Sequence, residues 1–301
     1  MVDYNLQVGT TPIRAEVIDS LVKQTAARMY KFKQACAIVP TSAWKNTFFR
    51  EDLSTSSGPT GNLFKGLPRG ASFPQRDTPW ETVSVRIVKF GSEVNIPWED
   101  ILSNDINVMA RSIIRRTEDV VKAVDDHLWD SLTGTTLSEL NLRIQSYAIS
   151  GTVSGHGYWD ESSAAITDDL MSASRLIAVN GNYDVNDLIC FVSPRDKQSM
   201  MKWLADKGAQ WNALAQDITV NGGIGRLAGI TLIESVSVPA SYALVVKPKT
   251  CATINELVSL RSNTTDDPFK SVRVRVVEEL SVSVTDPLAI CVIQGTQSVN
   301  A

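Results

Sequence analysis

The segment between residues 47 and 90 constrains the fold of this chain more than any other part of its sequence. Its middle, SGPTGNLFKGLPRGASFPQRDTPW, is rich in Gly, Pro, Ser and Thr and has no helical period. A structureless stretch of this length is uncommon inside a compact domain. The segment nevertheless carries large apolar residues such as Leu63, Leu67 and Trp80, and disordered linkers are poor in such residues. We therefore expect an excursion from the body of the protein that has a structural role.

The excursion leads into ETVSVRIVKFGSEVNIP, where Val83, Val85 and Ile87 alternate with other residues and predict a β-strand. The simplest arrangement is a long two-stranded arm that projects from its own domain. An isolated two-stranded hairpin is marginally stable in water. The arm therefore needs another surface to lie on, and we expect that surface to belong to another copy of the same chain.

Two helices flank this arm. Residues 12–37 combine a capping Thr11 and a proline at the first helical position with an apolar face and a basic face. We interpret this helix as packing on a partner surface rather than on a membrane, because it lacks the Trp, Phe and Leu content of membrane-surface helices.

The second helix begins near Pro97 or Asn104 and ends before Gly134, with Ile113, Val120 and Val124 on a continuous apolar stripe. It would be roughly 40 Å long. Its acidic residues form either a solvated face or a surface on which a basic arm lies.

The second half of the chain predicts a compact α/β unit. A helix opens at Thr167 and closes at Gly181, the apolar run LICFV reads as a buried strand, and Ser193-Pro194 starts another helix. Four strand-like runs follow, namely ITLIES, YALVVK, VRVRVVEELSVSV and LAICVIQ.

The chain has four cysteines, two histidines and a formal net charge of −4. Cys190 and Cys291 lie in apolar runs, so we expect the cysteines to be reduced thiols in the core. Neither His127 nor His156 stands near a cysteine at metal-ligand spacing, and we expect no metal site and no cofactor. This net negative charge argues against a protein that binds along nucleic acid and covers it.

We find no set of residues that would carry catalysis, and we predict that the chain is not an enzyme. The run NGGIGRLAG lacks the Lys-Ser/Thr ending of a phosphate-binding loop and leads into a strand, which predicts a loop-to-strand turn. The adjacent carboxylates Asp125/Asp126 and Glu278/Glu279 are expected to point apart.

Three stretches of the sequence resemble the major capsid proteins of tailed phages, which have the Hong Kong 97-like fold. Residues 83–129 are similar to the family's recurrent strand, its I-P-x-E-x-I/L step and its spine helix. Residues 168–204 are similar to the helix–strand–Ser-Pro–helix unit of its A-domain. Residues 222–239 are similar to the Gly-rich turn and strand that precede its later strands.

The resemblance implies an α+β fold divided into the parts that this family has. These parts are an N-arm (1–46), an extended E-loop hairpin (47–82), a P-domain (83–145, with the spine helix at about 104–133), a compact α/β A-domain (146–264) and closing P-domain strands (265–301). It also implies two sets of residues that contact neighbouring subunits. The E-loop set is Arg50, Phe64, Lys65, Arg69 and Phe73, and the spine-helix set is Arg111, Arg115, Arg116, Glu118 and Asp119.

The resemblance further implies a structural subunit that self-assembles as hexamers and pentamers into an icosahedral capsid shell around a double-stranded DNA genome. It implies assembly in the host cytoplasm and no membrane partner. The implied partners are other copies of the chain, a portal, a decoration protein and enclosed DNA that is bound without sequence specificity. Because the resemblance begins almost at Met1, we expect a separate scaffolding protein.

Two alternatives stay open at the level of sequence. One is an encapsulin-type nanocompartment shell protein, which has the same fold, and the other is a soluble α/β enzyme with an unrecognised site. We expect Lys65 to contact a neighbour rather than to form the Lys–Asn cross-link of some relatives.

Overall fold

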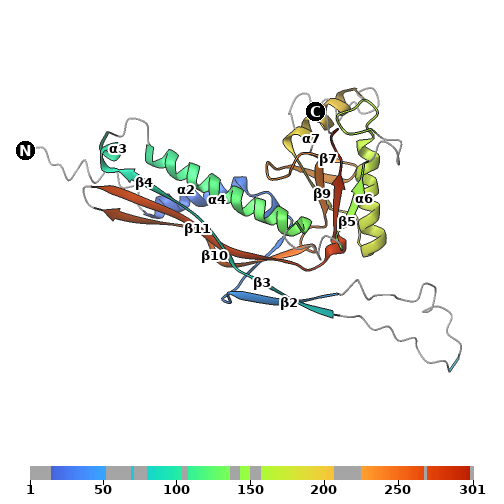
Figure 1. Ribbon diagram of the computed structural model, residues 1–301, viewed down its shortest axis with the longest axis horizontal. Helices are drawn as coiled ribbons and strands as arrows, with labels where there is room; N and C mark the ends of the chain where they lie inside the picture. The colour runs from blue at the N-terminus through green and yellow to red at the C-terminus, as the bar shows by residue number, and fades with distance from the viewer. Residues whose placement is uncertain are drawn as a thin grey trace, which may run out of the picture.

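The computed structural model describes residues 15–51, 69–70, 80–103, 108–135, 143–149, 157–206, 225–267 and 270–298. Within these ranges the chain forms a four-stranded sheet, a six-stranded sheet and a separate two-stranded sheet (Figure 1). Helices pack on both of the larger sheets.

The four-stranded sheet is built around a long antiparallel hairpin. Its strand order is β1 (Ala37–Pro40), β10 (Ala252–Asp267), β11 (Ser271–Val284) and β4 (Val88–Pro97). β4 is antiparallel to β11, and β1 is parallel to β10. Along β11, buried Val274 alternates with exposed Arg275, so the strand period of two gives the sheet one apolar face.

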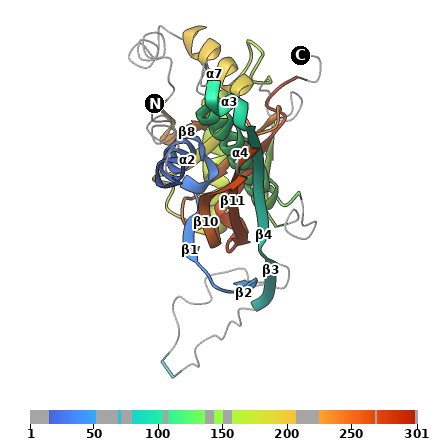
Figure 2. The same ribbon diagram turned by 90° about the vertical axis from the view of Figure 1, so that its left-hand side faces the viewer.

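Two helices cover this apolar face, α2 (Ala15–Met29) and α4 (Val108–Thr133) (Figures 1 and 2). α3 (Trp98–Ser103) lies between β4 and α4 in the chain. α4 has 26 residues, which corresponds to about 39 Å, and Gly134 follows it with a φ of 73°, the left-handed conformation that ends many helices. The buried residues that the helices and sheet share include Ile18, Val22, Ala26, Ile113, Val120, Val121, Val274 and Val276.

The six-stranded sheet mixes parallel and antiparallel pairs. β9 is antiparallel to both β12 and β6, whereas β5 is parallel to β12 and β8 is parallel to β6. The strand order is β5 (Gln145–Ala148), β12 (Ile290–Gln294), β9 (Tyr242–Val246), β6 (Ile189–Val192), β8 (Ile230–Glu234) and β7 (Arg226–Leu227).

Two helices, α6 (Ile166–Gly181) and α7 (Pro194–Asp206), pack in one cluster with side chains of this sheet. Ser193 caps α7, because its Oγ accepts a hydrogen bond from the Asp196 N–H at 3.1 Å and donates one to Asp196 Oδ2 at 2.7 Å. The short helix η2 (Pro287–Ala289) comes directly before β12.

The two larger sheets share one hydrophobic core, which lies where α4 ends against the six-stranded sheet. Phe32, in the short helix η1 (Phe32–Gln34), is fully buried there. Its ring centroid lies 4.4 Å from that of Phe191 in β6 and 6.0 Å from that of Trp129 in α4. The same cluster includes Leu244 and Val292 of the six-stranded sheet and Ile254 and Leu280 of the four-stranded sheet.

The two-stranded sheet projects from the body, as Figures 1 and 2 show. It consists of β2 (Lys45–Glu51) and β3 (Trp80–Arg86), which are antiparallel with Phe48 opposite Val83. The predicted two-stranded arm is therefore confirmed at its base.

Most of the predicted helices and strands are present, with three differences. The first helix ends at Met29 rather than near residue 37, because Phe32 leaves the helical path to enter the shared core. The alternating strand is divided at Ile87, since β3 pairs with β2 whereas β4 pairs with β11. Strand β10 was not predicted, and its two register shifts near Val258 interrupt the alternation that would have indicated it. The start of the first helix at Pro12 and the stripe residue Ile106 lie outside the described residues.

The domain division by residue number stays a prediction, and its expected boundary at 264/265 does not coincide with a change of sheet. β10 already belongs to the four-stranded sheet from Ala252, and the last strand, β12, belongs to the six-stranded sheet.

Other expectations are confirmed. All four cysteines are buried free thiols. The described part of the Gly-rich run, residues 225–229, leads into the β7–β8 turn, with Ala228 and Gly229 at positive φ.

A separate observation concerns the helices. Within the described ranges, none of them is both long and apolar enough to cross a membrane.

Candidate assembly surfaces

The inner face of the projecting hairpin carries an ion-pair cluster that joins it to the body. Arg50 of β2 donates through Nε to Glu81 Oε1 of β3 at 2.6 Å, and Arg143, just before β5, also pairs with Glu81. The hydrogen bond from Arg143 is the main reason why the pKa of Glu81 is lowered. This cluster fixes the base of the hairpin relative to the strand that begins the six-stranded sheet.

The outer face of the hairpin exposes large aromatic side chains. Phe49 is 69% exposed and Trp80 is 65% exposed. Phe49 lies opposite Thr82, and Trp80 lies opposite Glu51, so the two rings are diagonal neighbours on one face. We call Phe49 and Trp80, with the exposed Thr47, Thr82 and Ser84 around them, the aromatic face. Such exposure on a projecting element is typical of an interaction surface.

The solvent side of α4 carries a charged stripe. Arg111, Arg115 and Asp119 are exposed, and Asp119 pairs with Arg116 at 2.8 Å. Opposite the first half of this stripe, Ile113 and Thr117 face inward and are fully buried. A groove of about 890 Å³ separates the stripe from Val236, which follows β8 and is also exposed.

A sequence model of the phage capsid protein family matches residues 80–293, more than half of the 301-residue chain. The chain belongs to the phage capsid protein family. Its family members are structural shell proteins, so the prediction that the chain is not an enzyme is confirmed. A search of curated protein sequences gives no match.

Solved structures show that this family member has the Hong Kong 97-like fold. The cyanophage P-SCSP1u capsid aligns with a TM-score of 0.62 at 13% identity, over 89% of each chain. The virus-like particle from Pyrococcus furiosus aligns with a TM-score of 0.61 at 10% identity, over 91% of this chain and 97% of that one. Mycobacterium phage Che8 gives a TM-score of 0.57 at 15% identity, over 85% and 86%.

In this capsid protein the predicted E-loop contact residues occupy different environments. Arg50 is only 5% exposed and pairs with Glu81 of its own chain, and its contact with a neighbouring subunit stays a prediction. Arg69 is exposed beside Gly70, which has a φ of 81°. Phe64, Lys65 and Phe73 lie outside the described residues. The prediction missed Phe49 and Trp80, although the period of two along β2 and β3 separates them from the inward Phe48 and Val83.

The predicted spine-helix residues of the capsid protein all lie on solvent-accessible sides of α4. Arg111, Arg115 and Asp119 are exposed, and Arg116 and Glu118 are half-buried. Their contact with another subunit stays a prediction.

Two acids whose burial the sequence did not predict, Glu278 and Asp125, hold the segment between α2 and β1 of the capsid protein. Glu278 is fully buried and accepts hydrogen bonds from Tyr30 Oη and Lys33 Nζ. Burial, followed by the charge of Glu278, raises the pKa of Tyr30 above its usual range. Asp125 Oδ2 accepts the Lys31 N–H at 3.1 Å, and burial raises the pKa of Asp125 to about 7. We call residues 30–36 the junction segment.

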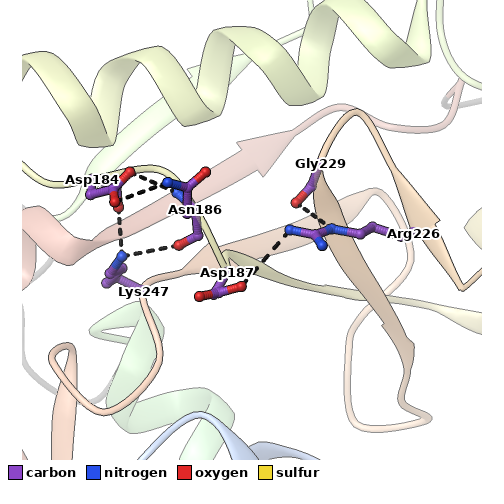
Figure 3. A network of polar contacts seen from close by, with 6 residues as sticks. All are labelled: Asp184, Asn186, Asp187, Arg226, Gly229 and Lys247. Carbon is purple, nitrogen blue, oxygen red and sulfur yellow. Dashed lines mark hydrogen bonds and ion pairs between the residues drawn. The ribbon is translucent and has the colours of Figure 1, made fainter.

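A second polar network lies where β6 begins and β9 ends in the six-stranded sheet (Figure 3). Lys247 Nζ donates to the carbonyl oxygens of Asp184 and Asn186 at 2.6 and 3.0 Å. Asp184 in turn accepts the Asn186 N–H at 3.1 Å, and Arg226 Nε donates to the Gly229 carbonyl at 2.9 Å. These contacts join the loop before β6 to the residue after β9, so we interpret the network as structural.

The histidines and metal-ligand candidates of the capsid protein add no reactive site to the described part of the chain. His127 packs against Phe90 with ring centroids 5.4 Å apart, and burial lowers its pKa. His156 lies outside the described residues. Among the residues that the structure describes, no three His, Cys, Asp or Glu side chains are grouped as metal ligands.

Proposed function

We propose that this chain self-assembles as hexamers and pentamers into an icosahedral shell that encloses a double-stranded DNA genome, with the aromatic face of each hairpin lying on a neighbouring subunit. Membership of the phage capsid protein family supports the shell. The observation that carries the role of the hairpin is the exposure of Phe49 and Trp80 on an element that projects from the body.

The energetic argument for the aromatic face rests on its apolar area. Burying one large apolar side chain contributes about 1.5–3 kcal/mol, and aromatic residues dominate the energetics of many interfaces. The Arg50–Glu81–Arg143 cluster holds the hairpin base in place, so little conformational entropy is lost at the base when the aromatic face meets a partner. A neighbouring copy is the expected partner, because a closed symmetric shell repeats one contact many times.

The remaining partners follow from the same proposal. A separate scaffolding protein and a portal would take part in assembly in the host cytoplasm, and a decoration protein would bind the finished shell. The chain carries a net charge of −4, which suits a wall that encloses DNA without binding it sequence-specifically. In this scheme residues 1–46 are the N-arm, residues 47–82 the E-loop, and α4 the spine helix of the P-domain.

The test compares wild type with the double variant Phe49→Ser/Trp80→Ser and with Thr82→Ser, a conservative change on the same exposed face. Each full-length chain is expressed with the structural proteins encoded beside it and is examined by size-exclusion chromatography and negative-stain microscopy. We expect closed particles from wild type and Thr82→Ser, and folded subunits without closed particles from the double variant. Normal particles from the double variant would show that the aromatic face does not hold neighbours together.

The contents of purified particles distinguish a virus shell from a compartment. Nuclease-protected double-stranded DNA supports the proposal, whereas particles that contain a specific cargo protein and no DNA support an encapsulin-type compartment.

A further inference from the structure

Two of the four cysteines lie side by side where β1 begins next to β10. Cys36 directly precedes β1, and Cys251 directly precedes β10. The two strands run parallel with Ala37 opposite Thr253, and Figure 2 shows them adjacent. The Cys251 thiol donates to the carbonyl oxygen of Ala35, the residue directly before Cys36, at 3.7 Å.

The backbone spacing at this position suits a disulfide. Neighbouring strands lie about 4.8 Å apart and rise about 3.3 Å per residue. Cys36 directly precedes Ala37, which pairs with Thr253, and Cys251 directly precedes Ala252. An offset of one residue between adjacent strands is compatible with the Cα separation of about 4.4–6.8 Å that disulfides occupy. The Cys251 thiol lies against the carbonyl group that is bonded to the Cys36 nitrogen, so it is directed towards Cys36.

We propose that Cys36 and Cys251 form an intramolecular disulfide when the chain meets an oxidising medium that contains a low-molecular-weight disulfide. One cysteine thiolate attacks the small disulfide, forms a mixed disulfide and releases one small thiolate. The second cysteine thiolate then attacks the protein sulfur, which forms the Cys36–Cys251 bond and releases the second small thiolate. The two cysteine protons pass to these leaving groups, so the protein is oxidised by two electrons and the small disulfide is reduced to two thiols.

The bond would fix the junction segment to the four-stranded sheet. Ala35 already accepts a hydrogen bond from the Lys249 N–H at 2.6 Å, and Phe32 holds the segment in the core that both sheets share. The hydrogen bond with Cys251, together with burial, raises the pKa of the Cys36 thiol, so the reactive thiolate is scarce at neutral pH. The pair therefore stays reduced during assembly in a reducing cytoplasm and oxidises slowly after release.

The other two cysteines provide a control within the same chain. Cys190 in β6 and Cys291 in β12 both lie opposite Val245 of β9. One strand separates them, which places their Cα atoms about 9.6 Å apart. Cysteines more than about 7 Å apart are not bridged without backbone movement, so this buried pair should stay reduced under the same treatment.

The test treats the full-length chain with oxidised glutathione or with dithiothreitol at pH 8.5, then alkylates it in denaturant and maps its peptides by mass spectrometry. In the oxidised sample we expect a Cys36–Cys251 linked peptide from most molecules and alkylated Cys190 and Cys291. The linked peptide should be lost in Cys251→Ser and kept in Cys190→Ser. Full alkylation of Cys36 and Cys251 after prolonged oxidation would overturn the proposal, as would a predominant link between any other cysteines.

A second measurement tests the same bond through stability. Closing a loop of this length restricts the unfolded chain, and we expect the thermal midpoint of the oxidised wild type to exceed that of the reduced protein by about 5 °C. The Cys36→Ser/Cys251→Ser variant should show no difference between the two conditions. An equal rise in that variant would assign the effect to something other than this disulfide.

Discussion

Glu278 and Glu279 are adjacent in β11, yet the pleat of the strand directs their side chains to different partners. Glu278 faces the junction segment, where Tyr30 and Lys33 donate to it without access to solvent. Glu279 lies 3.4 Å from Lys89, whose side chain is mostly exposed. The prediction that these carboxylates point apart is therefore confirmed, but the sequence alone did not show that one of them is a buried anchor.

The two glutamates form a matched pair for mutation. Glu278→Gln removes the charge that neutralises the buried Lys33 ammonium, and Glu256 at 3.6 Å compensates for it only in part. We expect this change to lower the free energy of unfolding by about 3 kcal/mol, measured by urea denaturation. Glu279→Gln should cost less than Glu278→Gln, because its partner Lys89 is mostly exposed and stays hydrated without the ion pair, whereas the Lys33 ammonium is buried. Equal losses in the two variants would contradict the proposed role of Glu278.

Asp125 makes the stability of the protein depend on pH. Its side chain is 4% exposed, its Oδ1 has no hydrogen-bond partner, and burial raises its pKa from 3.8 to about 7, with Lys33 lowering it and Asp126 raising it. Between about pH 4 and pH 7 the folded protein binds this proton and the unfolded chain does not. The stabilising effect of the proton is therefore present below about pH 4 and is lost as pH rises through 7.

Asp125→Asn tests this dependence, because its side chain carries no charge at any of these pH values. We expect its free energy of unfolding, relative to wild type, to increase as pH rises from 4 to 8. The gap between the two pKa values limits this increase to about 4 kcal/mol. Urea denaturation of both proteins at several pH values gives the measurement, with Asp206→Asn, a change at an exposed aspartate of α7, as the control. A constant difference between Asp125→Asn and wild type would show that Asp125 does not titrate in this range.

At the scale of elements, the spacing of apolar residues along the sequence predicted the helices and most strands well. The stripe through Ile113, Val120 and Val124 located α4, and the apolar run at Cys190 located β6. The same signal failed for β10, because that strand is polar and contains register shifts. The family resemblance placed Arg50 among the contact residues, and the sequence could not show that Arg143, far along the chain, would approach its partner Glu81.

The charged stripe of α4 carries a prediction at this scale. In the proposed shell a neighbouring basic arm lies across the acidic residues of this helix, so reversing these acidic charges should place like charges together and oppose assembly. We expect Glu118→Lys/Asp119→Lys to keep the unfolding free energy within about 1 kcal/mol of wild type, because both side chains reach solvent. Negative-stain microscopy should then show few or no closed particles, whereas Arg175→Glu on the exposed side of α6 should assemble as wild type. Normal assembly of the α4 variant would remove this stripe from the interface.

At the scale of the whole molecule, the shared core makes the two sheets one cooperative unit. Phe32 contacts Phe191 of the six-stranded sheet and Trp129 of α4, and the same cluster reaches Leu280 of the four-stranded sheet. The sequence did not predict this arrangement, because residues 12–37 have a helical pattern throughout and nothing in that pattern shows that residue 32 leaves the helix.

Phe32→Ala and Phe49→Ala compare the same change in a fully buried and a mostly exposed position. Removing the buried ring leaves a cavity between the two sheets, and we expect a loss of about 3–5 kcal/mol in the free energy of unfolding. The exposed change should stay within about 0.5 kcal/mol, because surface substitutions seldom alter stability by more. Circular dichroism and tryptophan fluorescence should report one shared unfolding transition for wild type. In Phe32→Ala the denaturation midpoint should be lower. The circular dichroism and fluorescence transitions should also separate, because the two sheets lose their common core. If Phe32→Ala behaved like Phe49→Ala, the two sheets would be stabilised independently.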